Sequence, residues 1–209
     1  MTHLKKTQET YRHIAADYAL AWQKRGSMLA ELEKFVALLP AGGTVLDIGC
    51  GPGKDTAVLQ SHNLNVIGLD YSYEMMQVGR DEYGRTVPFC QADMRHLPIG
   101  PQVDGIWACA SMLHLHREDM LPTLQQFWRV LKPSGVLYIS VKKGEGEQWV
   151  PTRKYGHDLP RYFTFWQPAH LDSLLETAAF KIIAGWEYQG KHDDWLDRFA
   201  QKLPMEAGQ

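Results

Sequence analysis

The 209-residue chain has few cysteines, no long apolar segment and almost no net charge. Its three cysteines, Cys50, Cys90 and Cys109, form no Cys-x-x-Cys pair, which argues against a disulfide framework or a zinc ribbon. No apolar run approaches the roughly 20 residues that a membrane span requires. The start of the chain carries charge without a following apolar segment, which is not typical of a signal peptide. We therefore expect a cytoplasmic protein that does not enter a membrane.

The charge balance argues against nucleic acid as a partner. Lys and Arg number 22 and Asp and Glu 24, so the net charge is −2 and no field of one sign covers the surface. Proteins held mainly by phosphate backbones usually have such a field, so nucleic acid is not an expected partner. The composition is 44% hydrophobic and 22% charged, which excludes disorder as the dominant state. Seven Trp, nine Tyr and seven Phe can fill a core or line a pocket for an apolar ligand.

Strand and helix patterns alternate along the middle of the chain. Short β-rich segments predict strands at 44–49, 65–70, 87–93, 103–110 and 135–141. Helical periodicity predicts helices at 54–63, 71–84 and 118–131. Such alternation is typical of a parallel sheet covered on both faces by helices. The sequence therefore predicts a doubly wound α/β fold.

The two ends of this pattern complete one predicted domain over 1–209. Residues 10–39 have helical spacing, so 1–40 are expected to form a helical N-terminal extension. Residues 142–166 lack clear periodicity but contain six aromatics, which argues for a functional loop and against disorder. A helix is expected at 167–180. Two strands, at 181–190 and 194–202, lie close enough in sequence to form an antiparallel hairpin.

The strongest site signal is the segment 45–56, VLDIGCGPGKDT. An apolar strand leads into Gly49, Gly51 and Gly53, where the backbone can turn tightly and approach a ligand, and then into a helix whose free amides can face a polar group. The carboxyl end of such a strand lies at the crevice where these sheets bind ligands. Asp70 ends the next strand 21 residues after Gly49, where a carboxylate can accept both ribose hydroxyls of an adenosine. These features predict a nucleoside-containing cofactor.

The spacing of the loop discriminates between cofactors. The third glycine comes one residue too early for the dinucleotide fingerprint G-x-G-x-x-G, and Asp47 is poorly placed for a pyrophosphate. An acid at this position suits a cofactor with a cationic amino-acid end. An NAD-dependent oxidoreductase is the less favoured alternative, and a non-catalytic cofactor-binding protein, a sensor or partner subunit, is another.

Four segments in order, VLDIGCGPGKDT, VIGLDYSYEMM, FCQADMRHLP and RVLKPSGVLYIS, resemble the small-molecule class I S-adenosylmethionine-dependent methyltransferases. The resemblance runs from about residue 10 to 200. It implies a seven-stranded sheet with an antiparallel last strand, S-adenosylmethionine as cofactor and S-adenosylhomocysteine as product. The cofactor-binding residues that it implies are Gly49, Gly51 and Gly53 on the methionine part, Asp47 near its ammonium, Asp70 on the ribose, Tyr71 and Met94 beside the adenine, Asp93 on its amine, and Ala110 near the methionine chain.

Methyl transfer requires an aligned nucleophile and exclusion of water, whereas a general base is optional. His114, just after the fourth predicted strand, is the best candidate base, with helix capping as the alternative; His116 is less favoured. Because His-x-His has no third ligand nearby, no metal is expected. The resemblance implies that Tyr11 and Tyr18 belong to a lid and cover the methyl group, with ordinary helix packing as the alternative.

Segment 142–166 lies where the resembled family inserts substrate-recognition elements. Glu147, Arg161, Tyr162 and Trp166 are expected to contact the acceptor, and a solvated lid surface is the alternative. The chain lacks the Asn/Asp-Pro-Pro-aromatic motif of DNA amino-methyltransferases and the Pro-Cys nucleophile of cytosine C5 enzymes. The expected reaction is metal-independent methyl transfer to O, N or S of a small molecule, by a monomer or a homodimer.

Overall fold

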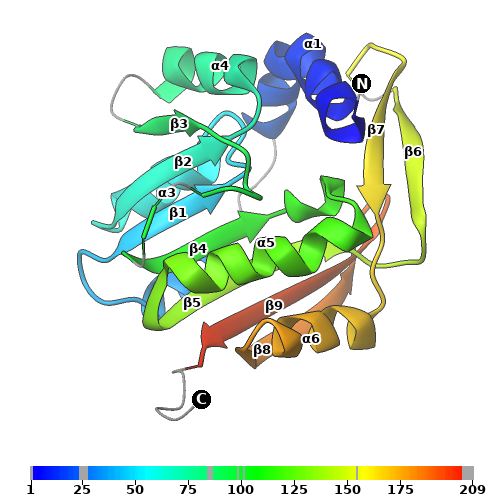
Figure 1. Ribbon diagram of the computed structural model, residues 1–209. Coiled ribbons are helices and arrows are strands. Elements are labelled where there is room, and N and C mark those ends of the chain that lie inside the picture. Colours follow the sequence, from blue (N-terminus) through cyan, green and yellow to red (C-terminus); the bar gives the residue numbers. More distant parts are fainter. Residues whose placement is uncertain are drawn as a thin grey trace.

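A computed structural model describes residues 2–23, 28–83, 87–97, 99–100, 102–153 and 155–203. Its centre is a seven-stranded sheet in the order β3-β2-β1-β4-β5-β9-β8 (Figure 1). The strands are β1 (Thr44–Ile48), β2 (Asn65–Asp70), β3 (Phe89–Gln91), β4 (Val103–Cys109), β5 (Leu131–Lys142), β8 (Phe180–Gln189) and β9 (Asp194–Lys202). Strands β1 to β5 are parallel, and β9 is antiparallel to both β5 and β8. The predicted doubly wound sheet with an antiparallel last strand is confirmed.

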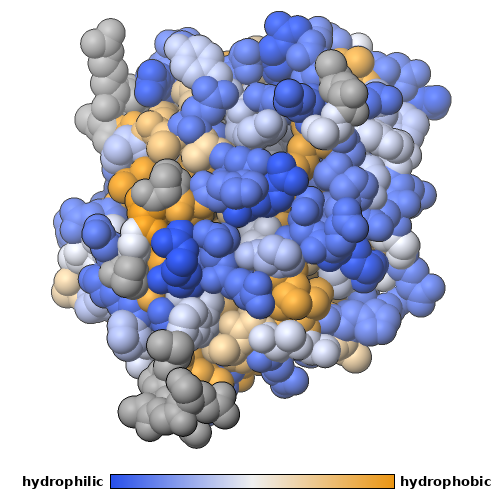
Figure 2. All heavy atoms as spheres, in the orientation of Figure 1, coloured by the Kyte–Doolittle hydropathy of each residue, from blue (hydrophilic) through white to orange (hydrophobic). Residues whose placement is uncertain are grey.

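The helices are α1 (His3–Gln23), α2 (Leu29–Ala37), α3 (Lys54–Ser61), α4 (Tyr73–Tyr83), α5 (Arg117–Val130) and α6 (Pro168–Thr177), with a 3₁₀ turn η1 (Met112–His114). Figure 1 shows α5 and α6 in front of the sheet. Helices α2 and α3 pack on the opposite face. In the same view the surface is mostly hydrophilic, with several groups of hydrophobic residues (Figure 2). Within the described ranges, no helix has both the length and the apolar character needed to cross a membrane.

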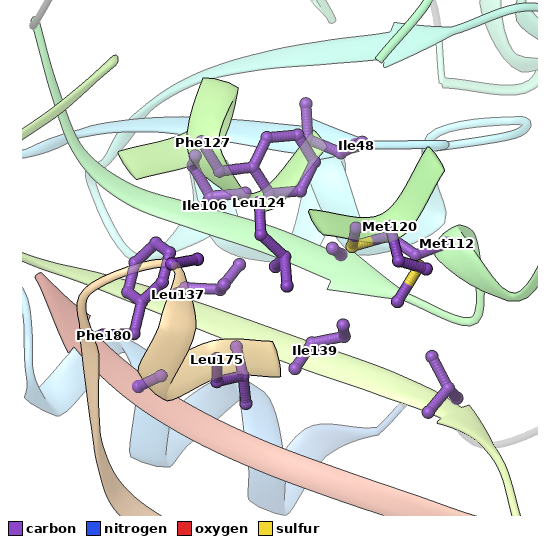
Figure 3. Close-up of a cluster of buried hydrophobic side chains, with 14 of the residues drawn as sticks. Ile48, Ile106, Met112, Met120, Leu124, Phe127, Leu137, Ile139, Leu175 and Phe180 are labelled. Carbon is purple, nitrogen blue, oxygen red and sulfur yellow. The ribbon is translucent and has the colours of Figure 1, made fainter. Parts of the chain in front are cut away.

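Each face of the sheet carries its own apolar cluster. Ile106 and Leu137 belong to the cluster beneath α5, where Leu124 and Phe127 are fully buried (Figure 3). Trp107, which follows Ile106 in β4, points to the other face and stacks on Tyr138, with ring centroids 3.9 Å apart. Because successive strand residues alternate between faces, burial on both sides fixes the register of the central strands. The carboxyl ends of β1, β2 and β4 are thereby held together at one edge.

Two elements differ from the sequence prediction. Helix α1 begins at His3, several residues earlier than expected. Residues 142–166, expected to be an irregular loop, contain β6 (Glu147–Thr152) and β7 (Leu159–Thr164), which form a separate antiparallel hairpin. Pro151 and Pro160 lie opposite each other in this hairpin, and proline lowers the expectation of a strand because it cannot donate to the ladder.

Helix α1 spans from α4 to the β6–β7 hairpin (Figure 1). The side chain of Gln8 donates to the carbonyl of Tyr71, 2.8 Å away, at the end of β2. The hydroxyl of Thr10 donates to the carbonyl of Pro160 in β7 at 2.7 Å. The N-terminal extension therefore lies over the edge of the sheet where the sequence predicts the site.

Candidate functional site

A cavity lies at the carboxyl ends of β1, β2 and β4, under one face of α1. Most of the predicted cofactor and catalytic residues line it. They are Tyr11, Tyr18, Asp47, Gly49, Gly51, Asp70, Tyr71, Met94, Ala110 and His114. The structure thus brings together residues from α1, the glycine loop, the end of β2 and the segment after β4.

The glycine loop has the backbone conformation that its composition suggests. Gly49, Gly51 and Gly53 have φ values of +69°, +55° and +83°, a region that side chains rarely adopt. Gly53 lies outside the cavity lining. A Cβ there would come within 2.6 Å of the Phe89 ring, so Gly53 permits the close packing that supports the loop.

Asp70 joins this loop to the end of β2. Its Oδ2 accepts the backbone N–H of Gly51 at 2.8 Å, and its Oδ1 accepts that of Ser72 at 2.7 Å. Burial raises the pKa of Asp70, and these backbone hydrogen bonds partly oppose the increase. A carboxylate has about four acceptor positions on its two oxygens, so Asp70 can accept further hydrogen bonds. The geometry therefore suits two adjacent hydroxyl groups on one ligand.

Two further acids lie beside the loop, one of them buried and the other half-buried. Asp47 is 3% exposed and accepts the hydroxyl of Thr56 at 2.5 Å, whereas Asp55 accepts the indole N–H of Trp107 at 3.0 Å. Burial raises the pKa of both acids, and the nearby Asp55 raises that of Asp47 further. A cation bound in the cavity would favour their charged forms. The sequence prediction missed Asp55, because an acid in a first helical turn is usually explained by the helix dipole.

The three predicted catalytic residues lie together. The rings of Tyr11 and Tyr18 meet edge to face with centroids 5.7 Å apart, and Oη of Tyr11 lies 2.9 Å from Nε2 of His114. Nδ1 of His114 lies 2.6 Å from the carbonyl oxygen of Tyr162. Because a carbonyl only accepts, Nδ1 carries the hydrogen and Nε2 accepts from Tyr11. Burial lowers the pKa of His114 to about 3, so its ring is neutral near pH 7.

The segment after β4 contributes Ser111 to the cavity as well as Ala110. The hydroxyl of Ser111 is buried, belongs to the cavity lining, and has no hydrogen-bond partner among the described residues. The preceding Ala110 has φ +52°, a strained conformation for a residue with a side chain. Strain of this kind concentrates at functional sites. An unsatisfied buried hydroxyl beside a strained turn is consistent with a ligand-facing position.

Asp93 is placed differently from its neighbour Met94. Its carboxylate accepts hydrogen bonds from Arg95, at 2.8 Å from Nη2 and 3.0 Å from the backbone nitrogen, and it lies outside the cavity lining. Burial raises the pKa of Asp93, but the hydrogen bonds and charge of Arg95 lower it overall. An adenine amine would have to share these oxygens with Arg95.

The residues predicted to contact the acceptor also lie outside the cavity lining. Arg161 donates from Nη1 to the hydroxyl of Tyr11 at 2.9 Å and so contacts a residue of the cavity lining. The hydroxyl of Tyr162 lies 2.7 Å from Nδ1 of His116. Both side chains instead connect the hairpin to its neighbours.

Glu147 and Trp166 both contact Arg117, at the start of α5. Glu147 accepts the backbone N–H of Arg117 at 2.7 Å, at the start of α5. Trp166 is 1% exposed and lies under the guanidinium of Arg117, 4.2 Å from the ring centroid. Over the described part of the chain, no group of three or more His, Cys, Asp or Glu side chains is arranged to hold a metal ion.

Comparisons with known proteins agree with this geometry. A family model described as "Methyltransferase domain" matches residues 45–135, from β1 into β5. The O-methyltransferase cnsE of Penicillium expansum is 34% identical over 161 residues, which are 71% of this chain and 56% of that protein. The chain spans about half the length of the curated relatives it matches.

Solved structures share the fold over nearly the whole chain. The 1,6-didemethyltoxoflavin-N1-methyltransferase of Burkholderia thailandensis, with 1,6-didemethyltoxoflavin and S-adenosylhomocysteine bound, has a TM-score of 0.70 at 20% identity and covers 94% of this chain and 87% of its own. A TehB-like S-adenosylmethionine-dependent methyltransferase of Corynebacterium glutamicum also has a TM-score of 0.70, at 18% identity, covering 90% and 97%. Residues 45–135 thus match a methyltransferase domain, and the chain shares its fold with solved S-adenosylmethionine-dependent methyltransferases.

Proposed function

We propose that the protein binds S-adenosylmethionine in this cavity and catalyses transfer of its methyl group to an O, N or S atom of a small molecule. One observation carries the proposal: Asp70 and the pair Asp47 and Asp55 lie along one cavity. Asp70 fits the two hydroxyls of a ribose, and the pair fits the ammonium of an amino-acid end. A ligand with both groups satisfies both parts of the cavity. A dinucleotide supplies no ammonium.

The acceptor side of the proposal has its own support. The solved Burkholderia thailandensis neighbour holds a small molecule as well as S-adenosylhomocysteine. In this chain Tyr11, Tyr18 and His114 line the same cavity as the acids. These groups combine apolar surface with a few polar atoms, which is typical of small-molecule sites.

The cofactor supplies a methyl group that its sulfonium activates. In such a transfer the acceptor's lone pair would form the new bond to carbon, and the electron pair of the broken S–C bond would stay on sulfur. Tyr11 and Tyr18 cover the cavity from α1 and exclude water. We assign alignment of the acceptor to these side chains. A base role for His114 would involve Nε2, the atom that accepts from Tyr11, so a proton would reach it through the Tyr11 hydroxyl.

Thermal unfolding with S-adenosylhomocysteine, with NADH in parallel, tests the proposal. A ligand at 100 times its Kd stabilises a fold by about 2.7 kcal/mol, which raises the midpoint by roughly 5–10 °C at this size. A rise with S-adenosylhomocysteine alone supports the proposal and justifies a screen of small metabolites as acceptors. A rise with NADH alone, or with neither ligand, overturns it. Tight binding without turnover on any acceptor would favour a non-catalytic sensor or partner subunit.

A further inference from the structure

A chain of three hydrogen bonds connects three separate segments at the cavity. Nη1 of Arg161, in β7, lies 2.9 Å from Oη of Tyr11, in α1. The same oxygen lies 2.9 Å from Nε2 of His114, in η1, whose Nδ1 lies 2.6 Å from the carbonyl oxygen of Tyr162. The hairpin therefore contributes both the first and the last group of the chain.

The two ends of this chain fix its direction. A guanidinium can only donate, and a backbone carbonyl can only accept. Arg161 thus donates to Tyr11, and His114 donates to Tyr162 from Nδ1. The single hydrogen of the Tyr11 hydroxyl is left for Nε2 of His114, because a neutral imidazole carries only one hydrogen. The Tyr11 oxygen keeps a second lone pair, which is conjugated with its ring and is a weaker acceptor than the one that Arg161 uses.

Aromatic rings hold the guanidinium in place. Its carbon lies 5.1 Å from the ring centroid of Phe163, 5.4 Å from that of Tyr11 and 5.9 Å from that of Tyr155. Such faces attract a planar cation and restrict its orientation. Arg161 is outside the cavity lining, whereas Tyr11 and His114 belong to it. Its hydrogen bond to Tyr11 therefore connects it to the cavity, and its charge also acts on His114.

We propose that Arg161 is a positioning residue, which holds the Tyr11 hydroxyl so that its hydrogen is committed to His114 and its remaining lone pair is available to the acceptor. This role rests on the proposed function, and it differs from the direct acceptor contact predicted from sequence. A hydroxyl fixed in this way accepts a hydrogen bond from an acceptor that carries O–H, N–H or S–H. The Tyr11 hydroxyl thereby orients the nucleophilic atom of the acceptor, and the proton of the acceptor is not transferred to His114.

Nitrogen-15 NMR of the histidine rings tests this arrangement without knowledge of the acceptor. His114→Asn identifies the His114 signals, and the wild type should show the neutral Nδ1–H tautomer with a hydrogen-bonded Nε2 from pH 8 to about pH 4. Arg161→Met should shift the Nε2 signal and raise the titration midpoint of His114, because the Arg161 charge contributes to its low pKa. Lys142 and His3, which also lower that pKa, are unchanged in the variant. Arg161→Lys should restore most of the wild-type behaviour.

Two controls separate positioning from general damage. Arg12→Met removes an exposed arginine from the same helix as Tyr11 and should leave the His114 signals unchanged. Tyr11→Phe should shift the Nε2 signal by itself, and adding Arg161→Met to it should produce a much smaller Nε2 shift than Arg161→Met produces in the wild type if Arg161 acts mainly through Tyr11. If Arg161→Met folds poorly, Arg161→Gln, which keeps a polar side chain, takes its place in the cycle.

An unchanged Nε2 signal in Arg161→Met, or an additive double variant, would overturn the positioning role. S-adenosylhomocysteine binding is measured on the same samples by thermal shift. If the wild type fails to bind, the proposed function falls while the NMR result still decides the hydrogen-bond chain. If binding is normal and the NMR cycle fails, only the role of Arg161 falls.

Discussion

Gly49 and Ser111 approach each other so closely that a Cβ added to Gly49 would lie 2.3 Å from the Cβ of Ser111. Non-bonded carbon atoms are best separated by roughly 3.5–4.0 Å, so no side chain fits at residue 49 without displacement of its surroundings. The contact joins the glycine loop after β1 to the segment after β4, and both residues line the cavity. The shape of the site thus depends on a missing side chain.

Gly49→Ala should therefore cost much more stability than backbone strain alone. Gly42→Ala is a matched control, because Gly42 has φ +70° against +69° for Gly49 but no described heavy atom within 4 Å of an added Cβ. We expect the control to lose about 1–2 kcal/mol in urea unfolding. Gly49→Ala should lose at least twice as much and also lose affinity for S-adenosylhomocysteine. Equal losses in the two variants would show that the loop relaxes freely.

The central sheet was predictable because its strands are short apolar segments separated by helices of regular periodicity. The hairpin was not predictable, since each of its strands contains a proline, Pro151 in β6 and Pro160 in β7. The helix that packs on it, α1, is also distant in sequence. The early start of α1 was missed for a similar reason. Its first residues form long-range contacts, such as that of Gln8 with Tyr71, and no local apolar pattern records them.

The site residues also differ in how far the sequence could place them. Residues at strand ends, such as Asp47 and Asp70, could be placed at the cavity because topology brings parallel strand ends together. The hairpin residue Arg161 was expected to meet the acceptor, but its actual neighbours are set by how α1 packs on the hairpin. The neutrality of His114 follows from its burial in the folded chain, which no motif encodes.

Asp70→Ala should weaken S-adenosylhomocysteine binding at least tenfold. The variant removes the acceptor of the Gly51 and Ser72 N–H groups as well as the proposed ribose contact. A hydrogen bond to a charged group contributes about 1.5–3 kcal/mol, and about 1.4 kcal/mol is tenfold in affinity. Titration calorimetry measures the effect. Asp104→Ala is the control, since Asp104 also accepts a backbone N–H, that of Thr44, away from the cavity; unchanged affinity in Asp70→Ala would exclude the ribose assignment.

Asp47→Asn should stabilise the free protein at pH 7 while it weakens ligand binding. Burial raises the folded-state pKa of Asp47, so the folded state binds more protons than the unfolded state above the ordinary value of 3.8. Stability from this group is therefore lost as pH rises from about 3.8 to the raised folded pKa. Removing the carboxylate should raise the midpoint at pH 7 by about 3 °C or more, equivalent to about 1 kcal/mol at this size.

Asp104→Asn provides the opposite sign for comparison. Burial raises the pKa of Asp104, but Lys132 and the Thr44 N–H lower it overall. The stabilisation that the Asp104 carboxylate contributes is therefore present above its unfolded pKa and lost as pH falls. Asp104→Asn should accordingly be less stable than the wild type at pH 7. Differential scanning fluorimetry between pH 4 and 8 compares the two. A destabilised Asp47→Asn protein at pH 7 would mean that Asp47 is already compensated in the free state.

His114→Gln should change how stability depends on acid. The pKa of His114 is about 3 in the folded chain against an ordinary value of 6.5, so between these values only the unfolded state binds the proton. Wild-type stability should therefore fall through this group as pH drops below 6.5, with a slope of up to about 1.4 kcal/mol per pH unit. The variant lacks this slope. The difference in free energy of unfolding by which it is less stable than the wild type at pH 7 should therefore shrink by about 2 kcal/mol by pH 4.5, measured by urea unfolding. His62→Gln, at the exposed end of α3, controls for the change of residue type. If the difference between wild type and His114→Gln stays constant over this range, the histidine is not held neutral, and direct base catalysis at His114 becomes the better account of its place in the cavity.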